Sequence, residues 1–341
     1  MMMRAGYLAE TKKLEVREVE VPACGDKDVL ISVKAAGLCG SDFHTFHGSH
    51  PFRKAPMILG HEAAGEVVKV GAKVSRIKVG DRVTVEPIMT CGTCIYCRNG
   101  QYNLCPNRIP AGLGGWIGSF AEYFVAEEKR VHLLPPELDY DLGVLVEPLA
   151  VGVHAVRMGN VTPGSSCAIL GAGTIGLLAG VAAQEAGASR VFCTDINTFR
   201  LEKAREMGMF SIKADTEPVE DIIRAAEPDG PEVILLAVTS PAVLDQAIKL
   251  VRRGGKVVVI ALFSKPITFD INTLQGCEID LKGSHIYTKE DFDTAMKILV
   301  DRKADLQKAI THHVNFNGMV EAFEMLADPQ NTAIKVIVKP E

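Results

Sequence analysis

Four of the nine cysteines lie within fifteen residues, in the stretch CGTCIYCRNGQYNLC. Their pattern is C-x2-C-x2-C-x7-C, and thiolates so closely spaced on a loop can supply the four ligands of a structural zinc site. Free buried thiols and an iron–sulfur cluster are the alternatives. The cysteine motif of ferredoxins has fewer residues between its last two cysteines than this loop has. However, a proline follows the final cysteine in ferredoxins, and Pro106 follows Cys105 here. A closed four-thiolate site leaves no position for a substrate. We therefore expect stability rather than catalysis from Cys91, Cys94, Cys97 and Cys105.

A second set of metal-ligating side chains is spread along the chain. One thiolate, one imidazole and one or two carboxylates can hold a zinc ion with an exchangeable position, as a catalytic site requires. No local spacing joins these residues, and a single cysteine is more often a core residue, so composition alone does not decide. The set comprises Cys39, Ser41, Asp42 and His44 in GLCGSDFHTFHG, His61 and Glu62 in ILGHEAAGEVV, and Glu147 in LVEPLAVGVHAV.

A glycine-rich turn indicates a dinucleotide site. In CAILGAGTIGLLAG, Gly171, Gly173 and Gly176 stand between an apolar strand and an apolar helix, which is the context that the G-x-G-x-x-G spacing needs. The first glycine makes the tight turn, the second admits a pyrophosphate, and the third lets the helix and the strand pack closely. The free N–H groups of the helix N-terminus then face the phosphates. Asp195, at the end of VFCTD, would accept the ribose hydroxyls of NAD and repel the extra phosphate of NADP.

The elements that must position these residues fall into three regions. Residues 1 to about 150 show short strand-like runs broken by turns. From about 162 to 288, apolar strands alternate with amphipathic helices, which predicts βαβ units and a parallel sheet. The remainder holds one predicted helix, in TKEDFDTAMKILVDRKADL, and a closing strand, AIKVIVKP.

Length and charge narrow the class of protein. A chain of 341 residues can form two domains, and a net charge of −5 gives no electrostatic case for binding nucleic acid or an anionic membrane. The start of the chain has no apolar core of signal-peptide length, and the uncharged run 165–184 divides into a strand, a turn and a helix. Nine cysteines, four of them at metal-ligand spacing, favour a reduced cytoplasm over disulfides.

Taken together, these motifs resemble those of the zinc-containing medium-chain alcohol dehydrogenases, in particular the branch of sorbitol (polyol) and threonine dehydrogenases. The motifs are CGSDFH, GHEAAGEVVKVG with VGDRV, the four-cysteine loop, EPLAVGVHA, and GAGTIG followed by TDI, and they run in family order along nearly the whole chain. The resemblance implies an α/β protein with a partly open, GroES-like β-barrel as its catalytic, zinc-binding domain. That domain would comprise residues 1–150 and 289–341, and a doubly wound Rossmann domain for NAD would comprise residues 151–288.

The same resemblance implies roles for individual residues. Cys39, His61 and Glu62 match the ligands of a catalytic zinc, and Glu147 matches a glutamate that binds the ion directly or through its water. Ser41 and His44 match a proton relay from the substrate oxygen to solvent, and Asp42 would lie behind the ligands. Two zinc ions per chain are thus expected. The residues expected to line NAD, besides the three glycines and Asp195, are Ile175, Arg200, Leu262, Phe263 and Ser264, with Ile286 and Tyr287 nearby.

The implied reaction is a reversible oxidation of a secondary alcohol to a ketone, with hydride transfer to NAD. The stretch after His44 and the motif EPLAVGVHA favour the polyol side over threonine. However, Ile286 appears where sorbitol dehydrogenases carry an arginine, so a sugar acid, an inositol-like ring or a butanediol stays open. Pocket candidates are Arg53, His50, Trp116, Phe120 and His285, whereas His47 and His132 are expected to be surface or satisfied core residues.

Three other expectations are open to test. A nucleotide-binding protein of this fold without catalysis is one alternative, although such relatives usually lack the zinc ligands. A nucleic-acid-binding zinc module is another, but only Arg98 and Arg108 flank the cysteine loop. By analogy with the branch, we expect a homotetramer, or else a homodimer, that acts on a small-molecule substrate.

Overall fold

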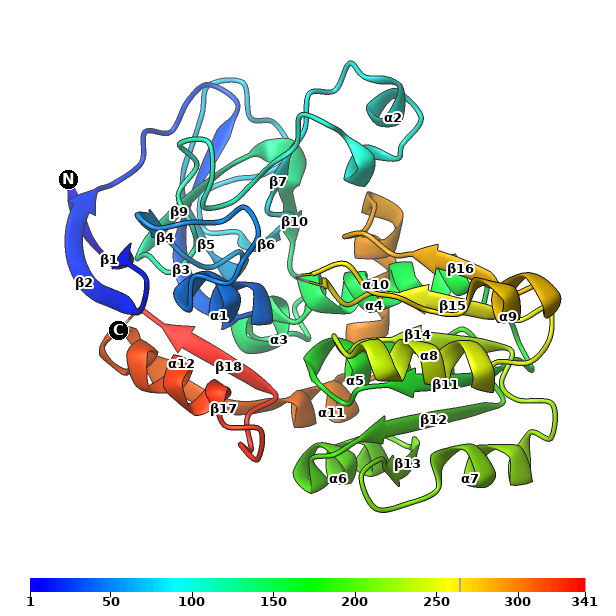
Figure 1. Ribbon diagram of the computed structural model, residues 1–341. Coiled ribbons are helices and arrows are strands. Elements are labelled where there is room, and N and C mark those ends of the chain that lie inside the picture. Colours follow the sequence, from blue (N-terminus) through cyan, green and yellow to red (C-terminus); the bar gives the residue numbers. More distant parts are fainter. Residues whose placement is uncertain (264, 341) are drawn as a thin grey trace. The chain divides into compact units, whose positions relative to one another are not determined.

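The computed structural model describes residues 1–263 and 265–340, which form two compact units (Figure 1). The first unit comprises Met1–Glu147 and Ile310–Glu341, and the second comprises Pro148–Ala309. Both ends of the chain therefore belong to the first unit, and the second is an insertion between them. Each unit is described by itself below.

The first unit is built around a seven-stranded sheet with the order β10-β6-β5-β3-β18-β17, in which β9 also pairs with β3. Strand β3 carries the apolar run DVLISVKAAGL and is buried along most of its length, as expected for a central strand. The sheet strands are β3 (Asp28–Leu38), β5 (Glu62–Val70), β6 (Arg82–Val85), β9 (Tyr123–Glu127), β10 (Val131–Leu133), β17 (Ile310–Asn315) and β18 (Lys335–Lys339).

Smaller elements complete the first unit. A three-stranded sheet has the order β2-β1-β4, and β7 pairs with β8. These strands are β1 (Met2–Glu10), β2 (Lys13–Glu20), β4 (Met57–Ile58), β7 (Ile88–Met89) and β8 (Ile109–Pro110). The helices are α1 (Gly40–Phe46), α2 (Ile95–Arg98), α3 (Tyr140–Val144) and α12 (Met319–Ala327), with 3-10 turns η1 (Tyr102–Leu104), η2 (Glu128–Arg130) and η4 (Phe316–Gly318).

Pairing at long sequence separation brings the end of the chain to the site. Strand β18 runs antiparallel to β3, with Val336 opposite Leu38, and parallel to β17. Lys335, the first residue of β18, therefore lies beside the end of β3, directly before Cys39. Figure 1 shows β18 (red) beside β17 and α12 within this unit.

The second unit is a six-stranded parallel sheet with the order β13-β12-β11-β14-β15-β16. Numbered within the unit, this order is 3-2-1-4-5-6, which is the doubly wound arrangement of dinucleotide-binding domains. The strands are β11 (Ser166–Leu170), β12 (Arg190–Asp195), β13 (Phe210–Lys213), β14 (Val233–Leu236), β15 (Lys256–Val259) and β16 (Asp280–Gly283).

Helices connect the parallel strands. Helix α5, TIGLLAGVAAQE, is apolar nearly all round, and most of its residues are buried, so it packs as a core helix. The helices are α4 (Val146–Gly159), α5 (Thr174–Glu185), α6 (Thr198–Glu206), α7 (Val219–Ala226), α8 (Pro241–Leu250), α9 (Ile271–Gly276), α10 (Lys289–Asp301) and α11 (Lys303–Leu306), and the turn η3 (Gln307–Ala309) follows. Among the described residues, no helix combines the length and the apolar character needed to span a bilayer.

The second unit extends further than the expected domain boundary at residue 288. Helix α10 belongs to the second unit, where it contacts α5, and it buries Phe292, Ala295 and Leu299. In addition, His154 Nδ1 on α4 lies 2.8 Å from Asp291 Oδ2 on α10. The amphipathic pattern of this segment predicts a helix with one buried face, but it does not say which sheet that face covers.

Candidate functional site

Three of the four expected catalytic-zinc ligands lie together in the first unit. Cys39 directly follows β3 and is the N-cap of α1, while His61 directly precedes β5 and Glu62 is its first residue. The ligand atoms of these three side chains all lie within 4.8 Å of one another. Glu62 is fully buried, and the His61 side chain is only 11% exposed. One thiol, one imidazole and one carboxylate in so small a group fit a zinc ion with an open fourth position.

Glu147, the fourth expected ligand, is placed differently. It lies in the first turn of α4, is buried, and is not part of the group formed by Cys39, His61 and Glu62. Its charge acts on Lys335, as does that of Glu62. The geometry therefore favours Glu62 as the carboxylate of the group.

Lys335, which the motifs do not contain, contacts the group formed by Cys39, His61 and Glu62. Its Nζ donates to both carboxylate oxygens of Glu62, at 2.8 and 2.7 Å, and to the backbone oxygen of Leu38 at 3.2 Å. Burial lowers the pKa of an ammonium group, but the charge of Glu62 outweighs this, so the pKa of Lys335 is raised. A lysine within the apolar strand AIKVIVKP is the signal that could have found it.

Asp42 lies behind the group, as expected from the resemblance. It is wholly buried in α1; its Oδ2 accepts from the backbone N–H of Cys39 at 3.2 Å, and its Oδ1 lies 3.4 Å from His61 Nδ1. Burial alone would raise the pKa of Asp42, but the charges of His61 and Arg53 hold it below its usual value. The carboxylate thus fixes the backbone of one ligand and the ring of another.

The expected proton relay lies on one face of α1. Ser41 and His44 are three residues apart, which places their side chains as neighbours on the helix surface. Ser41 is half-buried and His44 is exposed, and His44 Nδ1 lies 3.1 Å from Ser49 Oγ. Partial burial of its ring and the charge of His47 lower the pKa of His44. These positions suit the transfer of a proton from an inner hydroxyl to solvent.

The four cysteines of the loop form the second group of metal-ligating side chains, and their Sγ atoms also lie within 4.8 Å of one another. Cys91 Sγ lies 3.5 Å from Cys105 Sγ and 3.9 Å from Cys97 Sγ. The backbone N–H groups of Thr93 and Cys94 lower the pKa of Cys91 to about 5, which favours its thiolate form. Four sulfur donors in this arrangement fit a closed, tetrahedral zinc site.

A buried polar cluster joins this loop to the sheet of the first unit. Glu86 accepts hydrogen bonds from Tyr102 Oη at 2.5 Å and Arg130 Nη1 at 3.0 Å, and its Oε1 lies 2.7 Å from His132 Nε2. Arg130 Nη2 donates to Thr90 Oγ1, directly before Cys91. Burial opposes the charged form of Glu86, but these partners lower its pKa. His132 is therefore a satisfied core histidine, as expected.

The glycine turn lies at the carboxyl end of β11. Gly171 has φ +107°, and a Cβ at Gly176 would lie 1.8 Å from the backbone oxygen of Gly171, so both positions require glycine. A Cβ at Gly173 would meet no atom within 4 Å among the described residues, and no side chain caps α5. The turn therefore leaves an open cradle at a helix N-terminus, which fits a pyrophosphate.

Asp195 is oriented toward this turn. Its Oδ2 accepts from the backbone N–H of Ala172 at 2.7 Å, and its Oδ1 accepts from that of Asn197 at 2.9 Å. Arg200 follows in α6, and its buried Nε has no hydrogen-bond partner within the described part of the chain. An unsatisfied buried donor in the helix that follows Asp195 fits a bound polar group such as a nucleotide.

The other expected NAD contacts follow the carboxyl ends of neighbouring strands. Leu262 is exposed and Phe263 is half-buried after β15, and Ile286 is half-buried after β16. Tyr287 is fully buried, with its ring 5.6 Å from the ring of Phe292. Ile175 lies in the first turn of α5, and Ser264 lies outside the described residues.

Most of the proposed pocket residues are core residues instead. Phe120 is fully buried, and Trp116, 6% exposed, donates from Nε1 to the backbone oxygen of Val125. His50 accepts the backbone N–H of Arg53 at 3.1 Å, and Arg53 is buried as well. His285 is the exposed member of the set. The apolar or paired surroundings of the buried four correct the expectation that they line a substrate pocket.

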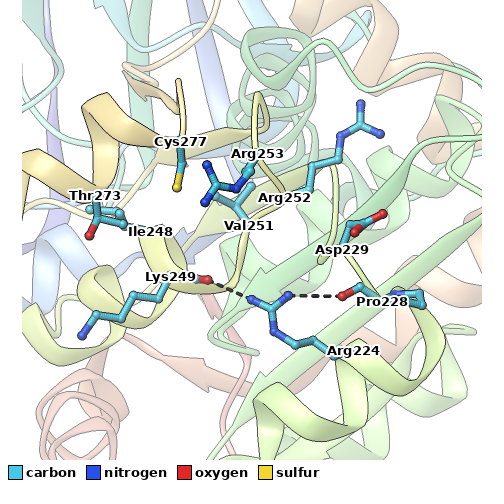
Figure 2. Close-up of a pocket in the computed structure, with 10 residues that line it drawn as sticks. All are labelled: Arg224, Pro228, Asp229, Ile248, Lys249, Val251, Arg252, Arg253, Thr273 and Cys277. Atoms are coloured by element: carbon cyan, nitrogen blue, oxygen red, sulfur yellow. Dashed lines mark hydrogen bonds between the residues drawn. The ribbon is translucent and has the colours of Figure 1, made fainter.

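A cavity of about 510 Å³ in the second unit is distinct from the glycine turn (Figure 2). It lies beside the segments that precede β14 and β15, so it is at the amino edge of the parallel sheet, whereas the turn is at the carboxyl edge. Figure 2 shows Arg224 donating to the backbone oxygens of Pro228 and Lys249. The other lining residues are Asp229, Ile248, Val251, Arg252, Arg253, Thr273 and Cys277.

The donor groups and the doubly wound unit together define a zinc-dependent dehydrogenase that uses a nicotinamide dinucleotide. Two family models match the chain: the alcohol dehydrogenase GroES-like domain over residues 25–136, and the zinc-binding dehydrogenase over residues 174–301. The chain belongs to the zinc-containing medium-chain alcohol dehydrogenases, in their sorbitol dehydrogenase branch. The expected family, fold class and enzyme class are thereby confirmed.

Individual relatives cover nearly the whole chain. Sorbitol dehydrogenase from Bacillus subtilis is 35% identical over 99% of this chain and 97% of its own length. L-idonate 5-dehydrogenase from Vitis vinifera is 33% identical over 98% of this chain and 93% of its own. Among solved structures, a zinc-binding dehydrogenase from Sinorhizobium meliloti bound to NADP superposes with a TM-score of 0.91 at 30% identity, covering 100% of both chains.

Proposed function

We propose that the chain oxidises a secondary hydroxyl of a polyol or sugar acid to a ketone, reversibly, with zinc and NAD. The observation that carries this proposal is the group of Cys39, His61 and Glu62, whose donor atoms lie within 4.8 Å of one another. A thiolate, an imidazole and a carboxylate hold zinc in catalytic sites with three protein ligands. By the resemblance, the first unit would be the catalytic domain and the second the NAD domain.

The residues of the first unit have separate tasks in this reaction. When bound, zinc supplies a Lewis acid that lowers the pKa of a hydroxyl by several units, and NAD supplies the hydride acceptor. Ser41 would accept the substrate's hydroxyl proton, and His44 would pass it to solvent. The lowered pKa of His44 keeps it neutral, and thus able to accept a proton, at neutral pH. Cys91, Cys94, Cys97 and Cys105 would hold a second zinc ion that stabilises the loop.

The choice of NAD over NADP depends on Asp195. Both of its oxygens are oriented by backbone N–H groups, so the carboxylate is fixed next to the glycine turn. A carboxylate there favours the two ribose hydroxyls of NAD and repels a 2′-phosphate. One structural neighbour is bound to NADP, so the KM values for NAD and NADP are compared to test this preference.

The names of the relatives support the proposed substrate class. Relatives named sorbitol dehydrogenase and L-idonate 5-dehydrogenase support a polyol or sugar acid. L-threonine and butanediol are the alternative substrates. We further propose a cytoplasmic homotetramer, and all nine cysteines are unpaired in the described chain, in keeping with a reducing compartment.

The test is a screen of NAD reduction across polyols, sugar acids, L-threonine and simple secondary alcohols, with a chelator-treated control. We expect turnover of at least one polyol or sugar acid, and loss of this turnover after metal removal. Full activity in metal-free protein would contradict the role of zinc. Binding of NAD with no turnover of any substrate would instead favour a non-catalytic protein of the same fold.

A further inference from the structure

Arg53 is a charged side chain buried next to the proposed zinc group. It lies between α1 and β4, and its side chain is 6% exposed. Its Nη2 donates to the backbone oxygen of Ala111 at 2.9 Å, and its Nη1 lies 3.4 Å from Asp42 Oδ1 and 3.5 Å from His61 Nδ1. A guanidinium so enclosed is not free to bind a substrate, so its function must be sought in these contacts.

Asp42 is the partner that explains the position of Arg53. Four groups approach its carboxylate: the backbone N–H groups of Cys39 and Gly60, the ring of His61, and the guanidinium of Arg53. Asp42 is wholly buried, and a buried carboxylate is costly unless a positive charge and hydrogen bonds compensate it. The compensation therefore has to be present in every state in which Asp42 is ionised.

Metal binding changes the charge balance around Asp42. An imidazole binds a metal ion through a lone pair and is then neutral, with its other nitrogen free to donate. With His61 in this form, Arg53 is the one cation among the groups recorded around the Asp42 carboxylate. Arg53 Nη1 and His61 Nδ1 are then both donors, so each must point to Asp42 rather than to the other.

We propose that Arg53 is a positioning residue, which supplies the countercharge of Asp42 in the metal-loaded protein and so keeps the His61 ring aimed at the ion. This inference rests on the proposed function, because it requires an ion at Cys39, His61 and Glu62. Groups that orient a ligand histidine from behind commonly contribute 10- to 100-fold to metal affinity. The contribution of Arg53 should therefore be to metal binding more than to the stability of the metal-free fold.

The test uses Co²⁺ as a spectroscopic probe, in protein whose four-cysteine site keeps its zinc. Three variants are compared: Arg53→Met removes the charge, Arg53→Lys retains it without the planar fork, and Arg82→Met is the matched control. Arg82 is a half-buried arginine of the same unit that bonds the backbone oxygen of Leu138. The readouts are the Co²⁺ dissociation constant, the visible absorption of the bound ion, and the denaturation midpoints with and without metal.

We expect Arg53→Met to weaken Co²⁺ binding by about tenfold or more, to shift the absorption bands, and to lower the midpoint of the loaded protein more than that of the metal-free protein. Arg53→Lys should recover most of the affinity, and Arg82→Met should bind as the unsubstituted protein does. Unchanged affinity and absorption in Arg53→Met would overturn the inference, and so would equal losses of midpoint with and without metal. If Arg53→Met does not fold, Arg53→Lys decides the question. Weaker Co²⁺ binding and shifted absorption bands in Arg53→Lys would support the proposal, and Co²⁺ affinity and absorption identical to those of the unsubstituted protein would overturn it. Failure of the unsubstituted protein to bind Co²⁺ at this site would instead overturn the proposed function.

Discussion

Lys335 Nζ lies 2.8 and 2.7 Å from the two carboxylate oxygens of Glu62, a residue 273 positions earlier in the chain. Both side chains are almost wholly buried. The pair therefore connects the last strand of the first unit to the carboxylate of the proposed zinc group. Since both oxygens of Glu62 contact the ammonium, Lys335 restricts where this carboxylate can lie relative to Cys39 and His61.

The first prediction concerns this pair. In the metal-free protein, Lys335→Met should lower the free energy of unfolding of the first unit by about 3–5 kcal/mol, because the Glu62 carboxylate is then buried without a countercharge from either the ammonium or a zinc ion. The emission of Trp116, the single tryptophan and a core residue of this unit, reports the transition in denaturant. Lys335→Arg keeps the positive charge, so its free energy of unfolding should decrease much less. An unchanged midpoint in Lys335→Met would mean that the pair does not stabilise the unit.

The glycine turn offers a matched pair of substitutions. Gly176→Ala should destabilise the second unit, because its Cβ would lie 1.8 Å from the backbone oxygen of Gly171. Gly173→Ala meets open space in the protein, so it should leave the stability unchanged and weaken NAD binding by about tenfold or more. Thermal denaturation and titration with NADH separate the two effects. Normal NAD affinity in Gly173→Ala would argue against a pyrophosphate at this turn.

Asp195 tests the choice of dinucleotide. Asp195→Ala should raise the KM for NAD by about tenfold and lower that for NADP, because it removes both the ribose partner and the repulsion of the 2′-phosphate. Asp215→Ala, which removes an exposed carboxylate after β13, serves as the control. An unchanged ratio of the two KM values in Asp195→Ala would place the selectivity elsewhere.

The polar cluster around Glu86 predicts a dependence of stability on pH. Its pKa is lowered from the usual 4.5 in the folded protein, so the folded state binds fewer protons than the unfolded state in acid. The stabilisation is therefore fully present above pH 4.5 and is lost as the pH falls through the lowered value. Glu86→Gln should be less stable by about 3 kcal/mol at pH 7.

The quantity to measure is the difference in the free energy of unfolding between the unsubstituted protein and Glu86→Gln. Denaturation is followed by the emission of Trp116 at a series of pH values. The difference in the free energy of unfolding between the unsubstituted protein and Glu86→Gln should be constant above pH 4.5 and should decrease below it. Subtraction removes the loss of zinc in acid, which both proteins share. A difference that stays constant down to pH 3 would show that Glu86 has no lowered pKa.

The sequence predicts the parts of the site that depend on short spacing. The four cysteines share one loop, the glycine turn follows one strand, and Asp195 ends the next strand, so local motifs are enough to place each of them. The proximity of Cys39 to His61 and Glu62 was implied by family resemblance rather than by spacing. The antiparallel pairing of β3 with β5 is what brings these residues together.

Other contacts are made between residues that are far apart in the sequence and share no motif. Lys335 contacts Glu62 because β18 pairs with β3, and the sequence AIKVIVKP alone does not predict that pairing. Arg53 was expected to be a pocket residue, yet the fold buries its side chain against Asp42. The boundary of the second unit likewise depends on what helix α10 packs against. Burial and long-range pairing decide these positions.

The most direct test of the central claim compares Cys39→Ser with Cys105→Ser by elemental analysis, NADH titration and turnover. If Cys39 helps to hold a catalytic zinc, Cys39→Ser should keep the zinc of the four-cysteine loop, bind NADH with nearly unchanged affinity, and lose about 10³-fold or more in turnover. Cys105→Ser should instead lose the zinc of the four-cysteine loop, and its main defect should be in stability rather than in turnover. A Cys39→Ser protein that retained both zinc ions and full turnover would contradict the account.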